Sequence, residues 1–139
     1  GTTSDAFMAN LDLLPTFAAI TDQKLTPDEA RDGFNQLALF VEEAGVSARD
    51  VSLIQSHKRS HTSLRQGDWV YIPEAGDGGW MKAEQGDPAR QLYNLKEDPS
   101  QKNNRIADYP EQADAMAALL KKTLAERGTK TPKINEKKK

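Results

Sequence analysis

The chain has 139 residues, of which 37% are hydrophobic and 29% charged, with a formal net charge of −2. This length allows one modest domain, and the low apolar content predicts a small core. The near-neutral charge gives no electrostatic reason to expect nucleic acid, and the absence of cysteine excludes disulfides, thiolate zinc sites and cysteine nucleophiles in this chain. No apolar run approaches the roughly 18 residues that a membrane-spanning helix needs.

The first 45 residues carry one weak strand pattern and two helix-start signals. Residues 4–11 are rich in apolar side chains, and Phe7, Ala9 and Leu11 stand at alternate positions, which predicts a short strand, although a helical turn fits nearly as well. Asp12 as an N-cap, with Pro15 in the first turn, predicts a helix. A second start signal lies at residues 26–29 and is interrupted by Asp32-Gly33. From Phe34 to Val41 apolar residues recur at helical spacing, and Gly45 closes the segment.

Four short segments from residue 51 onward are rich in β-branched, leucine or aromatic residues and are bounded by turn-forming residues. These predicted strands are Val51–Gln55, Ser63–Arg65, Trp69–Ile72 and Gln91–Leu95. A hairpin turn is expected at residues 66–68, a long glycine-rich loop at 73–88 and a further turn at 98–100.

The last predicted element is an amphipathic helix that starts after Asp108 and ends at Gly128. Its apolar face consists of Ala113, Met116, Ala117, Leu120 and Leu124. The polar residues 129–139 are expected to be a disordered tail. The predicted fold class is α+β: a small antiparallel sheet of about four strands packed by the C-terminal helix and preceded by further helices.

Several stretches, in the right order, resemble the C-terminal portion of the type I sulfatases, which are relatives of alkaline phosphatase. The most specific is Arg90 to Pro110, RQLYNLKEDPSQKNNRIADYP, which is similar to the closing signature of that family. Leu64 to Ile72 resembles its preceding strand pair, with Val70 where the family usually has lysine. The other matches are Ser4-Asp5, Asp12 to Phe17, Asp32-Gly33, Gly78-Gly79-Trp80 and Thr131-Pro132.

This resemblance implies a domain organisation and a location. Residues 1–46 would be the end of the large N-terminal catalytic domain, 47–128 the C-terminal subdomain, and 129–139 the tail. The implied parent is an exported bacterial arylsulfatase or N-acetylgalactosamine-6-sulfatase-like enzyme, periplasmic or secreted, that acts on sulfated carbohydrate. Its partner would be the N-terminal catalytic domain.

The resemblance also implies a formylglycine nucleophile, made from Cys or Ser in a Cys/Ser-x-Pro-x-Arg motif, and a calcium ion. The chain has no cysteine, and no serine stands two residues before any of its prolines. The family's paired metal-binding aspartates and Asp-Asn pair are also absent. We therefore expect no catalytic residue, metal or cofactor in this chain, and no sulfatase activity from it alone.

One wall of a substrate pocket is the contribution that remains open. His57, Lys58, Arg59 and His61 lie between two predicted strands, and cationic or titratable groups suit a sulfated sugar. Trp80, in the glycine-rich loop, offers a ring for stacking on a sugar. A solvated basic loop and a locally packed tryptophan are the alternative interpretations.

Two other functions stay open, namely a binding module for anionic glycans and a purely structural domain without a ligand. If the catalytic domain is missing, an apolar surface should be exposed where it packed, and the chain should self-associate. The residues expected in this surface are Phe7, Leu11, Leu14 and Phe17.

Overall fold

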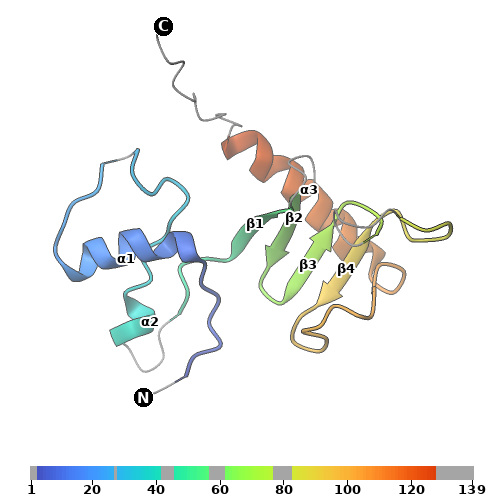
Figure 1. Ribbon diagram of the computed structural model, residues 1–139, viewed down its shortest axis with the longest axis horizontal. Coiled ribbons are helices and arrows are strands. Elements are labelled where there is room, and N and C mark those ends of the chain that lie inside the picture. Colours follow the sequence, from blue (N-terminus) through green and yellow to red (C-terminus); the bar gives the residue numbers. More distant parts are fainter. Residues whose placement is uncertain (1–2, 27, 42–45, 57–61, 77–82, 128–139) are drawn as a thin grey trace, which may run out of the picture. The chain divides into compact units, whose positions relative to one another are not determined.

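The computed structural model describes residues 3–26, 28–41, 46–56, 62–76 and 83–127. The chain divides into two compact units, Gly1–Ser52 and Leu53–Lys139, and the boundary falls inside the first strand. In chain order, the elements are the 3-10 helix η1 (Asn10–Asp12), α1 (Leu13–Ile20), α2 (Ala38–Val41), β1 (Val51–Gln55), β2 (Thr62–Gln66), β3 (Trp69–Ile72), β4 (Gln91–Asn94) and α3 (Pro110–Arg127) (Figure 1).

The first unit contains α1 as predicted but not the strand expected at residues 4–11. Its residues 10–12 form η1 and lead directly into α1. Asp12 precedes α1, but its side chain makes no capping hydrogen bond to that helix. The carboxylate instead accepts from the backbone N–H of Ala9 at 2.9 Å and of Phe34 at 2.9 Å. Asp12 is therefore the N-cap residue of α1 by position, as predicted, but its side chain does not cap this helix.

The second predicted helix begins later than the sequence suggested. Thr26 and Glu29 form the expected start, since the Glu29 carboxylate accepts from the Thr26 backbone N–H at 2.7 Å. The described residues from 28 to 37 contain no helix, and α2 is described over Ala38–Val41. The Gln36 backbone N–H donates to the Thr16 hydroxyl at 2.9 Å rather than within a helix. The predicted end at Gly45 lies outside the described residues.

The second unit is built on a four-stranded antiparallel sheet with the strand order β1-β2-β3-β4. Its strands agree with the predicted ones to within one residue at each end. β2 and β3 are joined by the two-residue loop Gly67-Asp68, in which only Gly67 has a positive φ, at 54°. That pattern is the requirement of a type II′ hairpin turn, so the predicted turn is confirmed.

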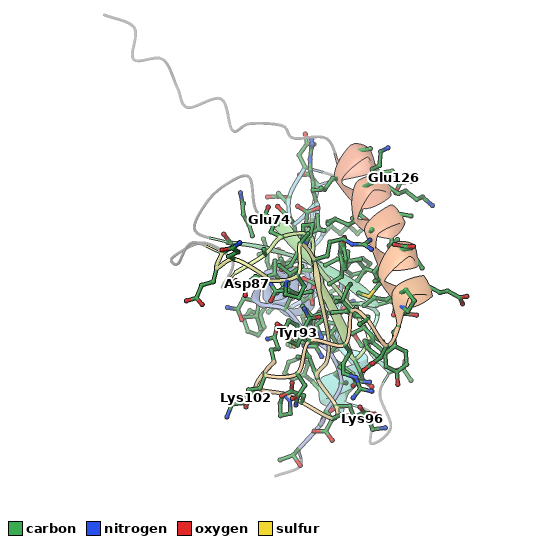
Figure 2. All side chains as sticks on the ribbon, turned by 90° about the vertical axis from the view of Figure 1, so that its right-hand side faces the viewer. Glu74, Asp87, Tyr93, Lys96, Lys102 and Glu126 are labelled. Atoms are coloured by element: carbon green, nitrogen blue, oxygen red, sulfur yellow. The ribbon has the colours of Figure 1, made fainter. Side chains whose placement is uncertain are left out.

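α3 packs against β2 and β3 and covers one face of the sheet. Figure 2, viewed at right angles to Figure 1, shows this helix on one side of the strands. The core between them is formed by side chains that are at most 6% exposed, namely Leu64, Tyr71, Leu92, Ala113, Met116 and Leu120. The structure thus has the predicted α+β fold.

The outer edge of β4 is covered by the segment that follows the Asp98-Pro99 turn. The Asn104 carboxamide accepts from the Leu92 backbone N–H at 3.0 Å and donates to the Arg90 carbonyl at 3.3 Å. The Arg105 backbone N–H then donates to the Leu92 carbonyl at 2.8 Å. Asn104, the last asparagine of the closing signature, therefore has a structural role.

Candidate functional site

The side chains predicted to line a substrate pocket lie outside the described residues. They are His57, Lys58, Arg59, His61 and Trp80. The structure does describe the strand ends on either side of both segments, and their placement follows from the strand order.

Four strand ends meet at one end of the sheet. Because neighbouring strands run antiparallel, the last residue of β1, Gln55, lies at the same end as Thr62, Ile72 and Gln91. We call this the Gln91 end of the sheet. The segment 57–61 connects Gln55 to Thr62, and Trp80 lies in the connection from Ile72 to Gln91. Both candidate segments therefore leave the sheet at the Gln91 end.

The Gln91 side chain makes three hydrogen bonds at this end. Its Nε2 donates to the carbonyl oxygens of Glu74 and Gly76, both at 2.7 Å. Its Oε1 accepts from the Tyr93 hydroxyl at 2.6 Å. Burial, followed by the charge of Asp98, raises the pKa of Tyr93, so the phenol remains a donor at neutral pH. The first turn of the connection from β3 is thus tied to β4.

A cavity of about 480 Å³ lies in the second unit between α3 and the sheet. The sheet side supplies Thr62, Tyr71, Pro73 and Glu74, while the helix side supplies Ala117, Leu120, Lys121 and Leu124. The walls are mainly apolar, with Glu74 and Lys121 as charged groups. Such a surface suits the uncharged part of a ligand better than a sulfate group.

Arg90 adds a described cation next to the Gln91 end. Its Nη1 lies 2.7 Å from the Asp114 carboxylate on α3, and both side chains are partly exposed. The hydrogen bond to Asp114, followed by one to Tyr71, raises the pKa of Arg90 further. The pairing with Asp114 leaves this position close to neutral overall.

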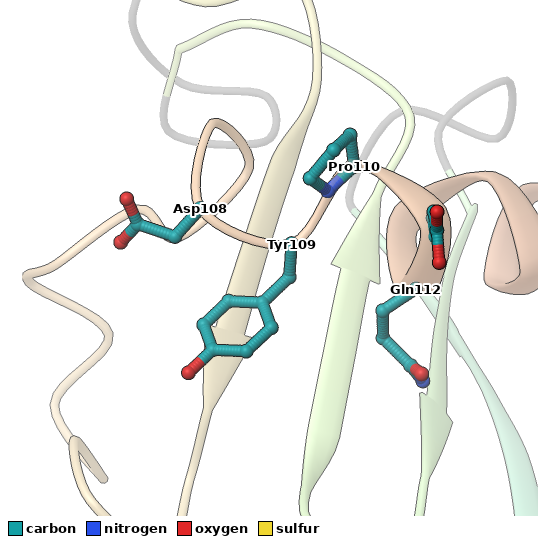
Figure 3. Close-up of a pocket in the computed structure, with 5 residues that line it drawn as sticks. Asp108, Tyr109, Pro110 and Gln112 are labelled. Atoms are coloured by element: carbon teal, nitrogen blue, oxygen red, sulfur yellow. The ribbon is translucent and has the colours of Figure 1, made fainter.

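A second cavity, of about 540 Å³, lies at the start of α3 (Figure 3). Its lining residues are Asp108, Tyr109, Pro110, Glu111 and Gln112. The centres of the Tyr109 and Trp69 rings are 5.1 Å apart. The Arg105 guanidinium lies 5.3 Å from the centre of the Tyr109 ring. Arg105 also pairs with Asp108 at 2.8 Å. These contacts occupy the aromatic surface and join α3 to the hairpin.

A buried polar cluster in the first unit escaped prediction altogether. Arg49 binds both carboxylate oxygens of Asp12 through Nε and Nη2, and both side chains are fully buried. Arg49 also donates to the carbonyl oxygens of Asp32 and Val51, and it lies 4.7 Å over the Phe34 ring. Burial alone would raise the pKa of Asp12, but its hydrogen bonds, that from Arg49 first, hold this pKa far below its usual range.

The cluster is completed by Gln36 and Ser47. The Gln36 carboxamide donates to the Asp12 carboxylate at 3.4 Å and accepts from the Ala48 backbone N–H at 2.8 Å. The Ser47 hydroxyl donates to the Phe7 carbonyl at 2.5 Å. Because each of these groups has a partner, the cluster stabilises the fold of this unit and offers no open position to a ligand.

The described residues do not fit the calcium ion that the sequence resemblance implied. In the part of the chain that the structure describes, no three histidine, aspartate or glutamate side chains are grouped so as to hold a metal ion. The sequence also supplies neither precursor motif of formylglycine. No chemical step through either group can be derived from this chain.

The predicted apolar surface is present in the first unit. Leu11, Leu14 and Phe17 are 43%, 52% and 53% exposed, whereas Phe7 is only partly exposed. Further large apolar side chains of this unit are exposed as well, namely Leu13, Ile20, Phe34, Phe40, Val41 and Val46. α1 buries Thr16 and Ala18 and presents most of its leucine and phenylalanine to solvent.

Three comparisons place the chain among known proteins. No family model matches it. Over 120 residues it is 31% identical to an N-acetylgalactosamine-6-O-sulfatase of Bacteroides thetaiotaomicron. The matched region covers 83% of this chain and 23% of the relative. The chain thus spans about a quarter of the length of this curated relative.

Solved structures agree in fold. A 6S-sulfatase structure associated with glycosaminoglycan metabolism by Bacteroides thetaiotaomicron has a TM-score of 0.64 and 29% identity, covering 81% of this chain and 24% of that one. A protein solved with its substrate D-glucosamine-2-N,6-O-disulfate has a TM-score of 0.70 over 98% of this chain and 28% of its own, at 22% identity. In sequence and in fold, this chain is similar to part of these sulfatases.

Proposed function

We propose that this chain is the C-terminal part of a sulfuric ester hydrolase that acts on sulfated carbohydrate, and that its Gln91 end forms one wall of the substrate pocket. The observation that carries the proposal is the strand order, because both candidate segments leave the sheet at the same end. The relatedness to an N-acetylgalactosamine-6-O-sulfatase supports the substrate class.

In this proposal the cations of the 57–61 segment contact sulfate or hydroxyl oxygens, and Trp80 stacks on a sugar ring. Residues 1–46 belong to the catalytic domain and 47–128 to the C-terminal subdomain. The formylglycine and calcium chemistry belongs to the catalytic domain, so this chain alone hydrolyses no sulfate ester. The parent is periplasmic or secreted. Among the described helices, none combines the length and hydropathy that a membrane crossing requires.

The exposed apolar residues of the first unit supply a contact surface for that catalytic domain. Without it, the same surface of Leu11, Leu14 and Phe17 brings copies of this chain together, since contiguous apolar patches rarely remain exposed on monomers.

The test compares sulfate release by this chain and by the full-length product of its gene, with calcium and a formylglycine-generating enzyme. We expect an active full-length enzyme on N-acetylgalactosamine 6-sulfate and an inert chain. The His57→Ala variant of the full-length enzyme should raise KM with little change in kcat. An inert full-length product would contradict the proposed activity, and unchanged kinetics of His57→Ala would leave the structural domain as the better description.

A glycan-binding module is the second candidate, carried by the basic segment 57–61. Binding of this chain alone to heparin that falls steeply with salt concentration would favour it.

A further inference from the structure

Gln91 is the described side chain that joins the Gln91 end of the sheet to the connection leaving it. It is only 8% exposed, and all three of its hydrogen bonds go to described protein groups. The sequence alone gives no reason to single it out, because two of its partners are backbone carbonyl oxygens.

The orientation of the Gln91 amide is fixed by its partners. A carbonyl oxygen can only accept, so Nε2 must face Glu74 and Gly76. The Tyr93 hydroxyl donates to Oε1 from the same face of β4, since residues two apart on a strand point the same way. A flipped amide would lose both hydrogen bonds to the carbonyl oxygens, because its own oxygen would then face them.

The backbone segment that accepts the two hydrogen bonds from Gln91 has an irregular conformation. Gly76 has a φ of 82°, a conformation that favours glycine, and it lies four residues beyond the end of β3. Residues 73–76 form bends rather than a strand, so no ladder hydrogen bonds support them. The two hydrogen bonds from Gln91 therefore contribute to fixing the direction in which the chain leaves the sheet.

We propose that Gln91 is a positioning residue for substrate binding: by holding the Glu74 and Gly76 carbonyls it fixes the base of the β3–β4 connection at the pocket wall. This inference rests on the proposed function, in which the Gln91 end faces the substrate. Gln91 touches neither the reacting atoms nor the sulfate, so its effect falls on binding rather than on the chemical step.

The experiment separates the two kinds of hydrogen bond in the full-length sulfatase. Gln91→Glu keeps an acceptor for Tyr93 but loses the donor for both carbonyls, whereas Tyr93→Phe removes only the bond to Oε1. With N-acetylgalactosamine 6-sulfate, we expect Gln91→Glu to raise KM about tenfold, with kcat changed less than about twofold. Tyr93→Phe should change KM by less than about threefold.

Two further variants, Gly76→Ala and Asn104→Ala, distinguish a positioning role of Gln91 from a general loss of stability. Gly76→Ala strains the held turn from the other side without altering β4, so it should raise KM as well. Asn104→Ala removes hydrogen bonds on the outer edge of β4, and should lower Tm while leaving KM unchanged. Unchanged KM in folded Gln91→Glu and Gly76→Ala enzymes would overturn the positioning role alone. A wild-type enzyme without sulfatase activity would overturn the proposed function and this inference with it.

Discussion

Arg49 and Asp12 form an ion pair in which both side chains are fully buried, whereas Arg31 and Asp28 form one at the surface. Removing one member of a buried pair leaves the other charged and unsolvated, which strongly destabilises the folded state. Replacing both members by apolar residues of similar volume often changes stability much less. A surface pair is solvated in either case and contributes little.

We therefore expect Arg49→Ala to lower the free energy of unfolding by about 3–5 kcal/mol. The control variant Arg31→Ala should leave it nearly unchanged. Urea denaturation followed by circular dichroism measures both. Equal losses in the two variants would contradict a central role for the buried pair.

The same carboxylate makes stability depend on acid. Because the pKa of Asp12 is lower in the folded chain than its ordinary value of 3.8, the stability that it contributes is present above that value. This contribution declines as the pH falls below 3.8 towards the folded-state pKa. Between pH 6 and pH 3 the Tm of the wild type should fall more steeply than that of Asp12→Asn. Parallel curves would show that other carboxylates cause the acid sensitivity.

At the scale of elements, α3 is joined to the sheet mainly by apolar contact. Met116 and Leu124 both lie on the predicted apolar face of α3. Met116 is fully buried, whereas Leu124 is 37% exposed. Met116→Ala should lower the free energy of unfolding by about 2–5 kcal/mol, because it removes buried volume and leaves a cavity. Leu124→Ala should lower the free energy of unfolding much less. Chemical denaturation of both variants measures the two losses. Equal losses would show that α3 does not pack on the sheet through Met116 as described.

Sequence patterns predicted those elements whose signals are local. β1 to β4, the hairpin at Gly67 and α3 follow from alternation, turn residues and helical spacing, and the structure confirms them. The family resemblance rests on the same stretches, so it was visible for the same reason.

Elements that depend on distant partners were not predictable in this way. The helical spacing begins at Phe34 but α2 begins at Ala38, because the Phe34 and Gln36 N–H groups donate to the Asp12 carboxylate and the Thr16 hydroxyl. Gly33 passes so close to α1 that a Cβ atom there would lie 2.5 Å from the Leu11 carbonyl oxygen and 2.9 Å from Pro15. The hydrogen bonds of Gln91 and the Asp12–Arg49 pair join residues whose proximity no local pattern reveals.

At the scale of the whole molecule, the first unit exposes the side chains that a small domain would normally bury. Phe17→Glu places a charge in this apolar surface. It should weaken self-association of the chain, raising the Kd at least about tenfold. Gln23→Glu adds the same charge at an exposed polar position and should have little effect.

Sedimentation velocity over a range of protein concentrations measures this association. A wild-type chain that stays monomeric at the highest concentration would contradict self-association. Equal weakening by both variants would point to general charge repulsion instead of the apolar surface.

The covering of β4 by Asn104 and Arg105 has a consequence for misassembly. The outer edge of β4 already has its Leu92 N–H and carbonyl groups paired, so an incoming chain finds no template there. β1 is the strand at the other edge of the sheet, and Ile54 on it is 47% exposed. We therefore expect amyloid-like growth or strand exchange between copies of this chain to use β1 rather than β4, and a proline or lysine placed in β1 should suppress it.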